Sequence, residues 1–138
     1  MCGVAGVVDL GLTGGASESV SSVVPWMLER LRHRGPDDQG IWTDPTCGVG
    51  IGNRRLAVVD LSKSGHQPMV DPGDRYVLSF NGEIYNHALL RDQLRSRGYP
   101  FIGRSDTEVL LAAIGEWGLT STLARINGMF AFVVWDRL

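Results

Sequence analysis

The first ten residues constrain the fold most, because a cysteine at position 2 directly precedes a short apolar run, Val4–Leu10. Such a run predicts a buried strand, and Gly11 and the Gly14-Gly15 pair are expected to close it. Cys2 should therefore lie at the start of a central strand of a sheet. A cysteine in such a place is usually a small, buried apolar residue. The rest of the chain therefore has to show whether Cys2 is catalytic.

Removal of Met1 would give Cys2 a second reactive group. The residue would then carry a thiol, with an ordinary pKa of about 8.5, beside a free α-amine with an ordinary pKa of about 7.7–8.0. Proton exchange between two such groups is nearly balanced at neutral pH. A nucleophile that is activated by an N-terminal amine is a recognised form of covalent catalysis, so Cys2 is the candidate nucleophile.

The composition narrows the class of protein. A length of 138 residues fits one domain, and a net charge of -2 with interspersed charges makes nucleic acid and anionic membranes unexpected partners. The apolar runs are short and no signal peptide is recognisable, which favours a cytoplasmic protein without a membrane span. The two cysteines, Cys2 and Cys47, are too few for a disulfide framework.

A metal site is not expected. The three histidines show no metal-ligand spacing to one another or to Cys47; they are His33, His66 and His87. Cys47 lies in a predicted turn and is expected to have no part in the chemistry.

Short apolar segments bounded by turn residues predict further strands at 40–42, 48–53, 76–80, 99–102 and 129–135. Asn81-Gly82 is expected to end the strand at 76–80 in a sharp turn, because both residue types tolerate a positive φ. Between the strands, helical signals begin near Ser17, Asn86 and Ser105. Antiparallel strands mixed with helices indicate an α+β fold.

Each helix has an expected feature. The first should tolerate Pro25 only near its first turn. The second has Asn86 as N-cap and should turn three leucines inward, namely Leu89, Leu90 and Leu94. The third begins with the capping-box spacing Ser105-Asp106-Thr107-Glu108, which predicts that the Ser105 side chain caps the helix.

Five separated segments together resemble one family, the class II glutamine amidotransferase domains. They occur in the order expected of that family: Cys2-Gly3-Val4-Ala5-Gly6, His33-Arg34-Gly35-Pro36-Asp37, Arg55-Leu56-Ala57-Val58-Val59-Asp60, Asn81-Gly82-Glu83-Ile84-Tyr85-Asn86 and Ser105-Asp106-Thr107-Glu108. The second and fourth segments look like those of glutamine-hydrolysing asparagine synthetases. The resemblance covers nearly the whole chain.

The resemblance implies an N-terminal-nucleophile hydrolase fold, a four-layer αββα sandwich of two antiparallel sheets. It implies that residues 1–138 are a glutaminase domain that hydrolyses L-glutamine to glutamate and ammonia. Because the sequence stops three residues after the apolar strand predicted at 129–135, we expect this domain to be incomplete at its C-terminus. The ammonia would pass to a C-terminal synthetase domain of the same polypeptide, which makes asparagine from aspartate with ATP and Mg²⁺. No cofactor is expected in the glutaminase domain itself, and a homodimer is one option for the assembly.

The resemblance also implies a role for each candidate residue. Cys2 would form a thioester with the glutamine side chain, while the Asn81 side-chain amide and the Gly82 N–H would form the oxyanion hole. Arg55 would clamp the α-carboxylate of glutamine and Asp106 would bind its α-ammonium. The remaining substrate-binding candidates line the pocket: Leu56, Ala57, Val58, Val59 and Glu83.

Each assignment has a structural alternative. Asn81-Gly82 can be a turn, the apolar residues after Arg55 can be core, and Asp106 suits the first turn of any helix. Two alternatives for the whole domain stay open. One is an amidotransferase domain that serves a sugar or secondary-metabolite acceptor, and the other is a binding or assembly module of the same fold that no longer hydrolyses glutamine.

Overall fold

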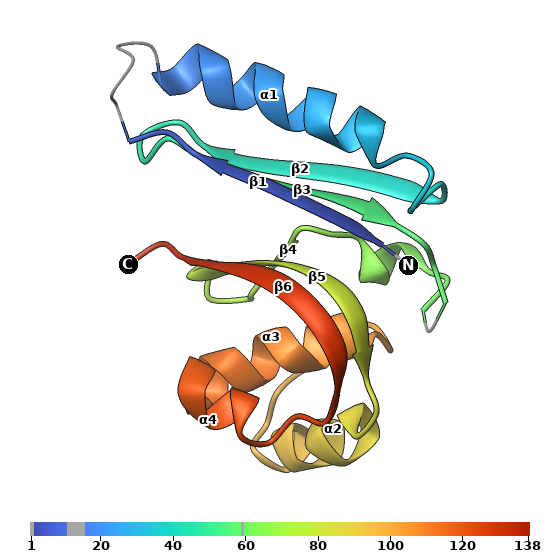
Figure 1. The fold of residues 1–138 in the computed structure, drawn as a ribbon. Coiled ribbons are helices and arrows are strands. Elements are labelled where there is room, and N and C mark those ends of the chain that lie inside the picture. Colours follow the sequence, from blue (N-terminus) through green and yellow to red (C-terminus); the bar gives the residue numbers. More distant parts are fainter. Residues whose placement is uncertain (1, 11–15, 59) are drawn as a thin grey trace.

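The computed structural model describes residues 2–10, 16–58 and 60–138, and it shows two antiparallel sheets stacked between helices (Figure 1). The expected turn at Gly11 and Gly14-Gly15 and the pocket candidate Val59 lie outside the described residues, as does Met1. The layers run from an N-terminal helix through the two sheets to a second group of helices. The predicted four-layer αββα arrangement is therefore confirmed.

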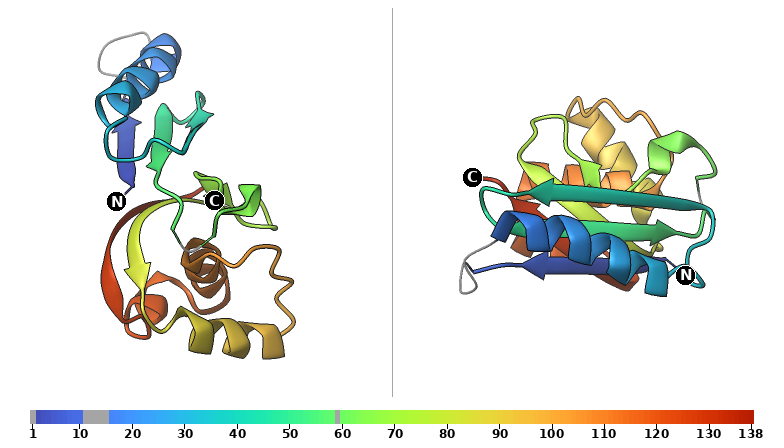
Figure 2. Two further views of the ribbon diagram at one scale, coloured as in Figure 1. Left: turned by 90° about the vertical axis from the view of Figure 1, so that its right-hand side faces the viewer. Right: turned by 90° about the horizontal axis from the view of Figure 1, so that it is seen from above.

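Sheet A consists of β1 (Gly3–Val8), β2 (Asp38–Asp44) and β3 (Val49–Arg55) in the order β1-β3-β2. The helix α1 (Ala16–Arg30) lies over its outer face (Figure 2). Two glycines of β3 let the helix approach closely, since a Cβ on Gly50 or Gly52 would come within 2.8 Å of Val24. The buried side chains of Val20, Val24 and Leu28 fill this contact.

Sheet B consists of β4 (Met69–Val70), β5 (Tyr76–Ile84) and β6 (Gly128–Asp136) in the order β4-β5-β6. A short 3-10 helix, η1 (Lys63–Gly65), precedes β4. The other face of the sheet is covered by α2 (His87–Ser96), α3 (Asp106–Trp117) and α4 (Leu119–Leu123). The largest core cluster joins β5 to α2 and α3 and includes Leu78, Phe80, Ile84, Leu94, Leu110 and Ile114.

One strand prediction and one helix prediction are wrong, because tertiary contacts override the local sequence signals. β1 is an edge strand of sheet A, since β3 pairs on both of its sides and occupies the centre. Pro25 lies in the interior of α1 rather than in its first turn. An interior proline removes one helical hydrogen bond, and the burial of Val24 and Leu28 against β3 offsets that loss.

A third correction concerns Asn81-Gly82, which lies inside β5 and is not a turn. The strand continues to Ile84 because β6 pairs with it, with Asn81 opposite Ala131 and Gly82 opposite Phe130. A Cβ on Gly82 would lie 2.4 Å from the carbonyl oxygen of Met129. Glycine is therefore required here by the close approach of β6, with a φ of 156°.

The predicted strand at 99–102 is a loop, because the Ile102 N–H donates to the Glu108 carboxylate (2.7 Å) instead of to a neighbouring strand. Leu89 is also misassigned, since it is 60% exposed on the outer face of α2. Asn86 precedes α2 but uses its side chain on Arg125 and Asn127 rather than as a cap. The cap on α3 is confirmed: the Glu108 N–H donates to Ser105 Oγ (3.2 Å).

Candidate active site

One pocket of about 230 Å³ forms where the start of β1, the end of β3, the second half of β5 and the start of α3 meet. It brings together most of the residues that the sequence marks as candidates: Cys2, Arg55, Leu56, Val58, Asn81, Gly82, Glu83 and Asp106. Ala57 does not line it. Val58 lines it from a site that is 72% exposed, so this residue belongs to the pocket rim.

Cys2 is held at the pocket by the backbone of Leu56. The Leu56 N–H donates to Cys2 Sγ (3.4 Å), and the thiol lies 3.7 Å from the Leu56 carbonyl oxygen. On its other side, Arg34 Nε donates to the carbonyl oxygen of Cys2 (3.2 Å). The sulfur and the main chain of this residue are thus fixed by two separate segments.

The segment from His33 to Asp37, to which the sequence assigns no chemistry, shapes the site indirectly. Besides the contact from Arg34, Asp37 Oδ2 accepts a hydrogen bond from the Ala57 N–H (2.8 Å). Gly35 packs against β3 so tightly that a Cβ would lie 2.3 Å from the backbone carbonyl of Arg54. This segment therefore fixes the strand end from which Arg55 and Leu56 reach the pocket.

Arg55 ends β3 and is only 8% exposed. Its guanidinium donates to the carbonyl oxygens of Ser62 (Nη1, 3.0 Å) and Asp60 (Nη2). A Cβ on Gly65 would overlap the guanidinium, so the loop closes directly on it. A guanidinium carries more N–H donors than these two carbonyls accept, which leaves donors for an anionic ligand in the pocket.

Asn81 and Gly82 reach the pocket from β5. Among the described residues, no hydrogen bond joins the Asn81 side chain to a partner, and its Oδ1 is buried. Buried amide groups are normally hydrogen-bonded. The Asn81 amide lines the same pocket as Cys2, and a bound ligand can supply the partner that its oxygen lacks.

Asp106 begins α3 and is 6% exposed. Its carboxylate accepts hydrogen bonds from the backbone N–H groups of Ile84 (3.0 Å) and Thr107 (3.0 Å). Burial raises the pKa of Asp106, although the Ile84 N–H and the neighbouring His87 favour its ionised form. A buried carboxylate in this environment gains most from a cationic ligand.

Gln67 was not among the predicted site residues, yet it lies buried in the pocket wall. Its Oε1 accepts hydrogen bonds from the Phe80 N–H (2.6 Å) and Asn53 Nδ2 (3.2 Å), and its Nε2 donates to Thr107 Oγ1 (3.2 Å). This one side chain therefore links sheet A, sheet B and α3. Such a role depends on contacts between distant segments and has no local pattern that could reveal it.

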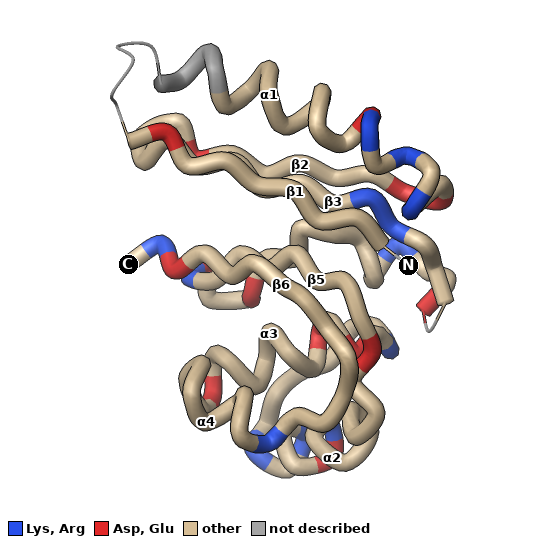
Figure 3. Tube along the Cα trace, viewed as in Figure 1, with Lys and Arg blue, Asp and Glu red and all other residues tan. Residues whose placement is uncertain are grey.

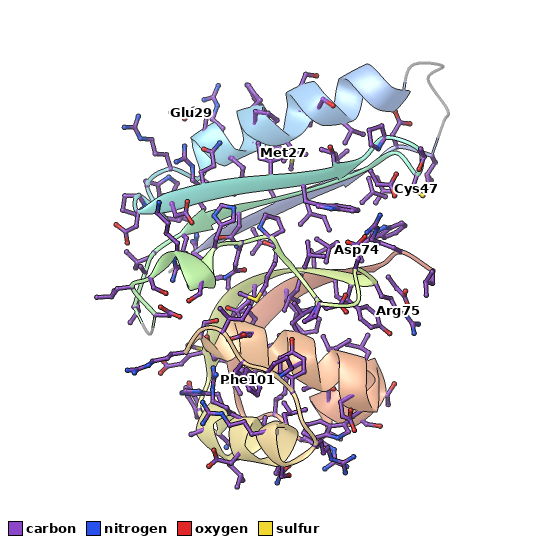
Figure 4. All side chains as sticks on the ribbon, turned by 180° about the vertical axis from the view of Figure 1, so that it is seen from behind. Met27, Glu29, Cys47, Asp74, Arg75 and Phe101 are labelled. Atoms are coloured by element: carbon purple, nitrogen blue, oxygen red, sulfur yellow. The ribbon has the colours of Figure 1, made fainter. Side chains whose placement is uncertain are left out.

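Acidic and basic residues are spread over both halves of the fold (Figure 3). Within the described ranges, no helix is long and apolar enough to cross a membrane, and no group of three His, Cys, Asp or Glu side chains could hold a metal ion. Cys47 is exposed at the tip of the β2–β3 hairpin (Figure 4), at the end of sheet A opposite Cys2.

Comparison with known proteins decides the family, because residues 1–138 match the family described as "Glutamine amidotransferase domain". The chain belongs to the glutamine amidotransferase family. This amidotransferase domain is 42% identical to asparagine synthetase [glutamine-hydrolyzing] 3 of Bacillus subtilis and 39% identical to asparagine synthetase [glutamine-hydrolyzing] 1 of the same organism. Each comparison covers 99% of the domain but only 22% and 21% of the relatives, so the chain spans about a fifth of their length.

The fold of the amidotransferase domain has a counterpart among solved structures. Glutamine phosphoribosylpyrophosphate amidotransferase from B. subtilis superposes with a TM-score of 0.66 at 25% identity. The match covers 79% of this chain and 31% of that one. The stacked sheets are thus shared with an amidotransferase that is named for phosphoribosylpyrophosphate.

Proposed function

We propose that this domain hydrolyses L-glutamine to glutamate and ammonia through a thioester on Cys2, and that the whole protein uses the ammonia to make asparagine from aspartate. The observation that carries the proposal is the single pocket in which a thiol, an unpartnered amide, a buried arginine and a buried carboxylate converge. The names of the B. subtilis relatives support glutamine as the nitrogen source.

The charges in the pocket suit a free amino acid. Arg55 offers a planar set of donors for an α-carboxylate, which accepts two parallel hydrogen bonds from a guanidinium. Asp106 offers a buried negative charge for an α-ammonium. With both ends of the amino acid held, its side-chain amide would extend toward Cys2.

The proposed reaction begins when Cys2 Sγ attacks the side-chain amide carbon of glutamine. The amide oxygen gains negative charge and accepts hydrogen bonds from Asn81 Nδ2 and the Gly82 N–H. The C–N bond breaks as the leaving nitrogen takes up a proton, which releases ammonia and leaves a thioester. Water then hydrolyses the thioester to glutamate and regenerates the thiol. The α-amine of Cys2, once Met1 is removed, would take up and return the protons.

The synthetase step belongs to a second domain of the whole protein. ATP and Mg²⁺ would be held there, and no residue of the described pocket is assigned to them. A sugar or secondary-metabolite acceptor would change that second domain and leave this pocket as it is. A non-hydrolysing module of the same fold is disfavoured, because Cys2, Arg55 and Asp106 all remain at the pocket.

The carboxylate clamp is tested by Arg55→Lys, which keeps the charge but loses the planar fork. We expect the KM for glutamine to rise about 10- to 100-fold while kcat changes little, because the lost interaction is made equally in the ground state and transition state. Glutamate release at varied glutamine concentration measures both constants. Arg32→Lys, in the exposed turn that follows α1, is the control. An unchanged KM for Arg55→Lys would place the clamp elsewhere.

The ammonium site is tested by pH. Since burial raises the pKa of Asp106 above that of an ordinary aspartate, its carboxylate becomes protonated at a higher pH than an exposed one. The neutral form cannot pair with an α-ammonium, so KM for glutamine should increase as the pH falls through the raised pKa and stay level above it. In the Asp106→Asn variant, KM should be high at every pH, and its increase at acidic pH should disappear. The same increase in the variant would assign the titration to another group.

A further inference from the structure

Asp60 organises the loop that follows β3, although its side chain does not contact the Cys2 sulfur. Its Oδ1 accepts hydrogen bonds from the Ser62 N–H (2.8 Å) and Ser62 Oγ (2.6 Å). Its Oδ2 accepts from Ser64 Oγ (3.2 Å) and the Arg104 N–H (2.9 Å). The residue is only 8% exposed, so this carboxylate uses both oxygens inside the protein.

The Ser62 contacts determine where two backbone carbonyls point. The loop that they close presents the carbonyl oxygens of Asp60 and Ser62 to the guanidinium of Arg55. Because those carbonyls bind one edge of the guanidinium, they set the direction in which its other donors face. Asp60 thus acts on Arg55 through the shape of the loop.

The Arg104 contact reaches the other end of the substrate site. Arg104 lies two residues before Asp106, and its N–H is tied to Asp60 Oδ2. Gly103 makes room for this contact, since a Cβ there would lie 3.0 Å from Asp60 Oδ2 and 2.7 Å from Ser64 Oγ. On the opposite side, Arg91 donates to the carbonyl oxygens of Gly103 (2.8 Å) and Ser105 (2.9 Å).

We propose that Asp60 is a positioning residue that fixes Arg55 and Asp106 relative to each other, and so sets the spacing between the α-carboxylate and α-ammonium subsites. The inference rests on the proposed function, because these subsites are those of glutamine. Asp60 connects the loop that orients Arg55 to the segment that leads into Asp106.

The ionisation of Asp60 supports this role. Burial alone would raise its pKa, but the hydrogen bonds from Ser62, from the Arg104 N–H and from Ser64 hold the pKa well below the usual range of an aspartate. The carboxylate is therefore charged wherever the enzyme works. An asparagine amide in its place has only one acceptor oxygen, so it cannot accept hydrogen bonds both from Ser62 and from the Arg104 N–H.

The test is Asp60→Asn in the whole protein, with steady-state release of glutamate as the readout. We expect KM for glutamine to rise about tenfold while kcat falls by less than about twofold, since the substrate ends are misplaced but Cys2 and Asn81 are not touched. In an Arg55→Lys background, Asp60→Asn should raise KM by less than about threefold, because its effect acts partly through the lost guanidinium.

The matched control is Asp71→Asn. Asp71 organises the turn before β5 in the same way, accepting hydrogen bonds from the N–H groups of Gly73 (2.9 Å), Arg75 (2.8 Å) and Tyr76, but it does not line the pocket. The Asp71→Asn variant should have a melting temperature lowered about as much as that of Asp60→Asn, but an unchanged KM for glutamine. This comparison separates a loss of stability from a loss of positioning.

The possible results distinguish the role of Asp60 from the proposed function. An active wild-type protein whose KM is unchanged by Asp60→Asn, or changed equally by Asp71→Asn, overturns the role of Asp60 alone. Full additivity with Arg55→Lys also overturns it. A wild-type protein that releases no glutamate from glutamine overturns the proposed function, and the positioning role with it.

Discussion

Replacing Cys2 with alanine is expected to abolish glutamate release, with kcat reduced by about 10⁴-fold or more, because the variant has no atom that can form the thioester. The remaining pocket still holds Arg55, Asn81 and Asp106, so glutamine should still bind. Glutamate production measures the loss, and protection of the variant against heat by glutamine measures the retained binding.

Cys47→Ala is the matched control for this experiment. Cys47 is exposed at the far end of sheet A and should leave kcat within about twofold of the wild type. Equal losses in the two variants would mean that the nucleophile is wrongly assigned. Intact mass gives a further check, since the proposed amine requires that the active protein lack Met1; full activity with Met1 retained contradicts the N-terminal amine as the base.

Asn81→Ala should lower kcat for glutamine hydrolysis about 100- to 1000-fold and leave KM within about threefold, because the amide is proposed to contact the oxygen only as it becomes negatively charged. The structure indicates that this substitution should have few side effects. Among the described residues, the Asn81 side chain has no hydrogen-bonded partner that truncation would leave unpaired. Steady-state kinetics supply both constants.

The exposed Asn127 provides the control for Asn81, since it lies outside the pocket and its alanine variant should retain full activity. A raised KM with unchanged kcat in Asn81→Ala would show that the amide binds ground-state substrate. In that case the oxyanion would need other donors, and the Gly82 N–H would be the remaining candidate on β5.

The elements with strong local signals could be predicted from the sequence. The Ser105 cap and the helix that follows it appear as expected, because a hydroxyl three residues before a backbone N–H is a short-range interaction. The apolar run at 129–135 likewise forms β6. The motifs around Cys2, Arg55, Asn81 and Asp106 are brought to one pocket, as the family resemblance implies.

The features that sequence reasoning missed depend on distant contacts. Asn81-Gly82 has the composition of a turn, but pairing with β6 keeps it extended within β5. Pro25 stays inside α1 because the helix is packed against the glycines of β3. Gln67 and Asp60 carry no motif of their own, and their importance depends on partners that lie far away in the sequence, such as Thr107 and Arg104.

The division of the pocket between the two sheets has a consequence for how this domain loses activity. Cys2 directly precedes β1 and Arg55 ends β3, so both lie at sheet A, whereas Asn81 lies on sheet B and Asp106 on the helix packed against it. Buried hydrogen bonds such as Asn53 Nδ2 to Ser79 Oγ (2.9 Å) hold the two sheets in register. A slight slide of one sheet over the other would separate the proposed nucleophile from the proposed oxyanion donor while every strand stayed intact. Inactivating substitutions are therefore expected along the whole sheet interface, well away from the residues proposed to contact glutamine.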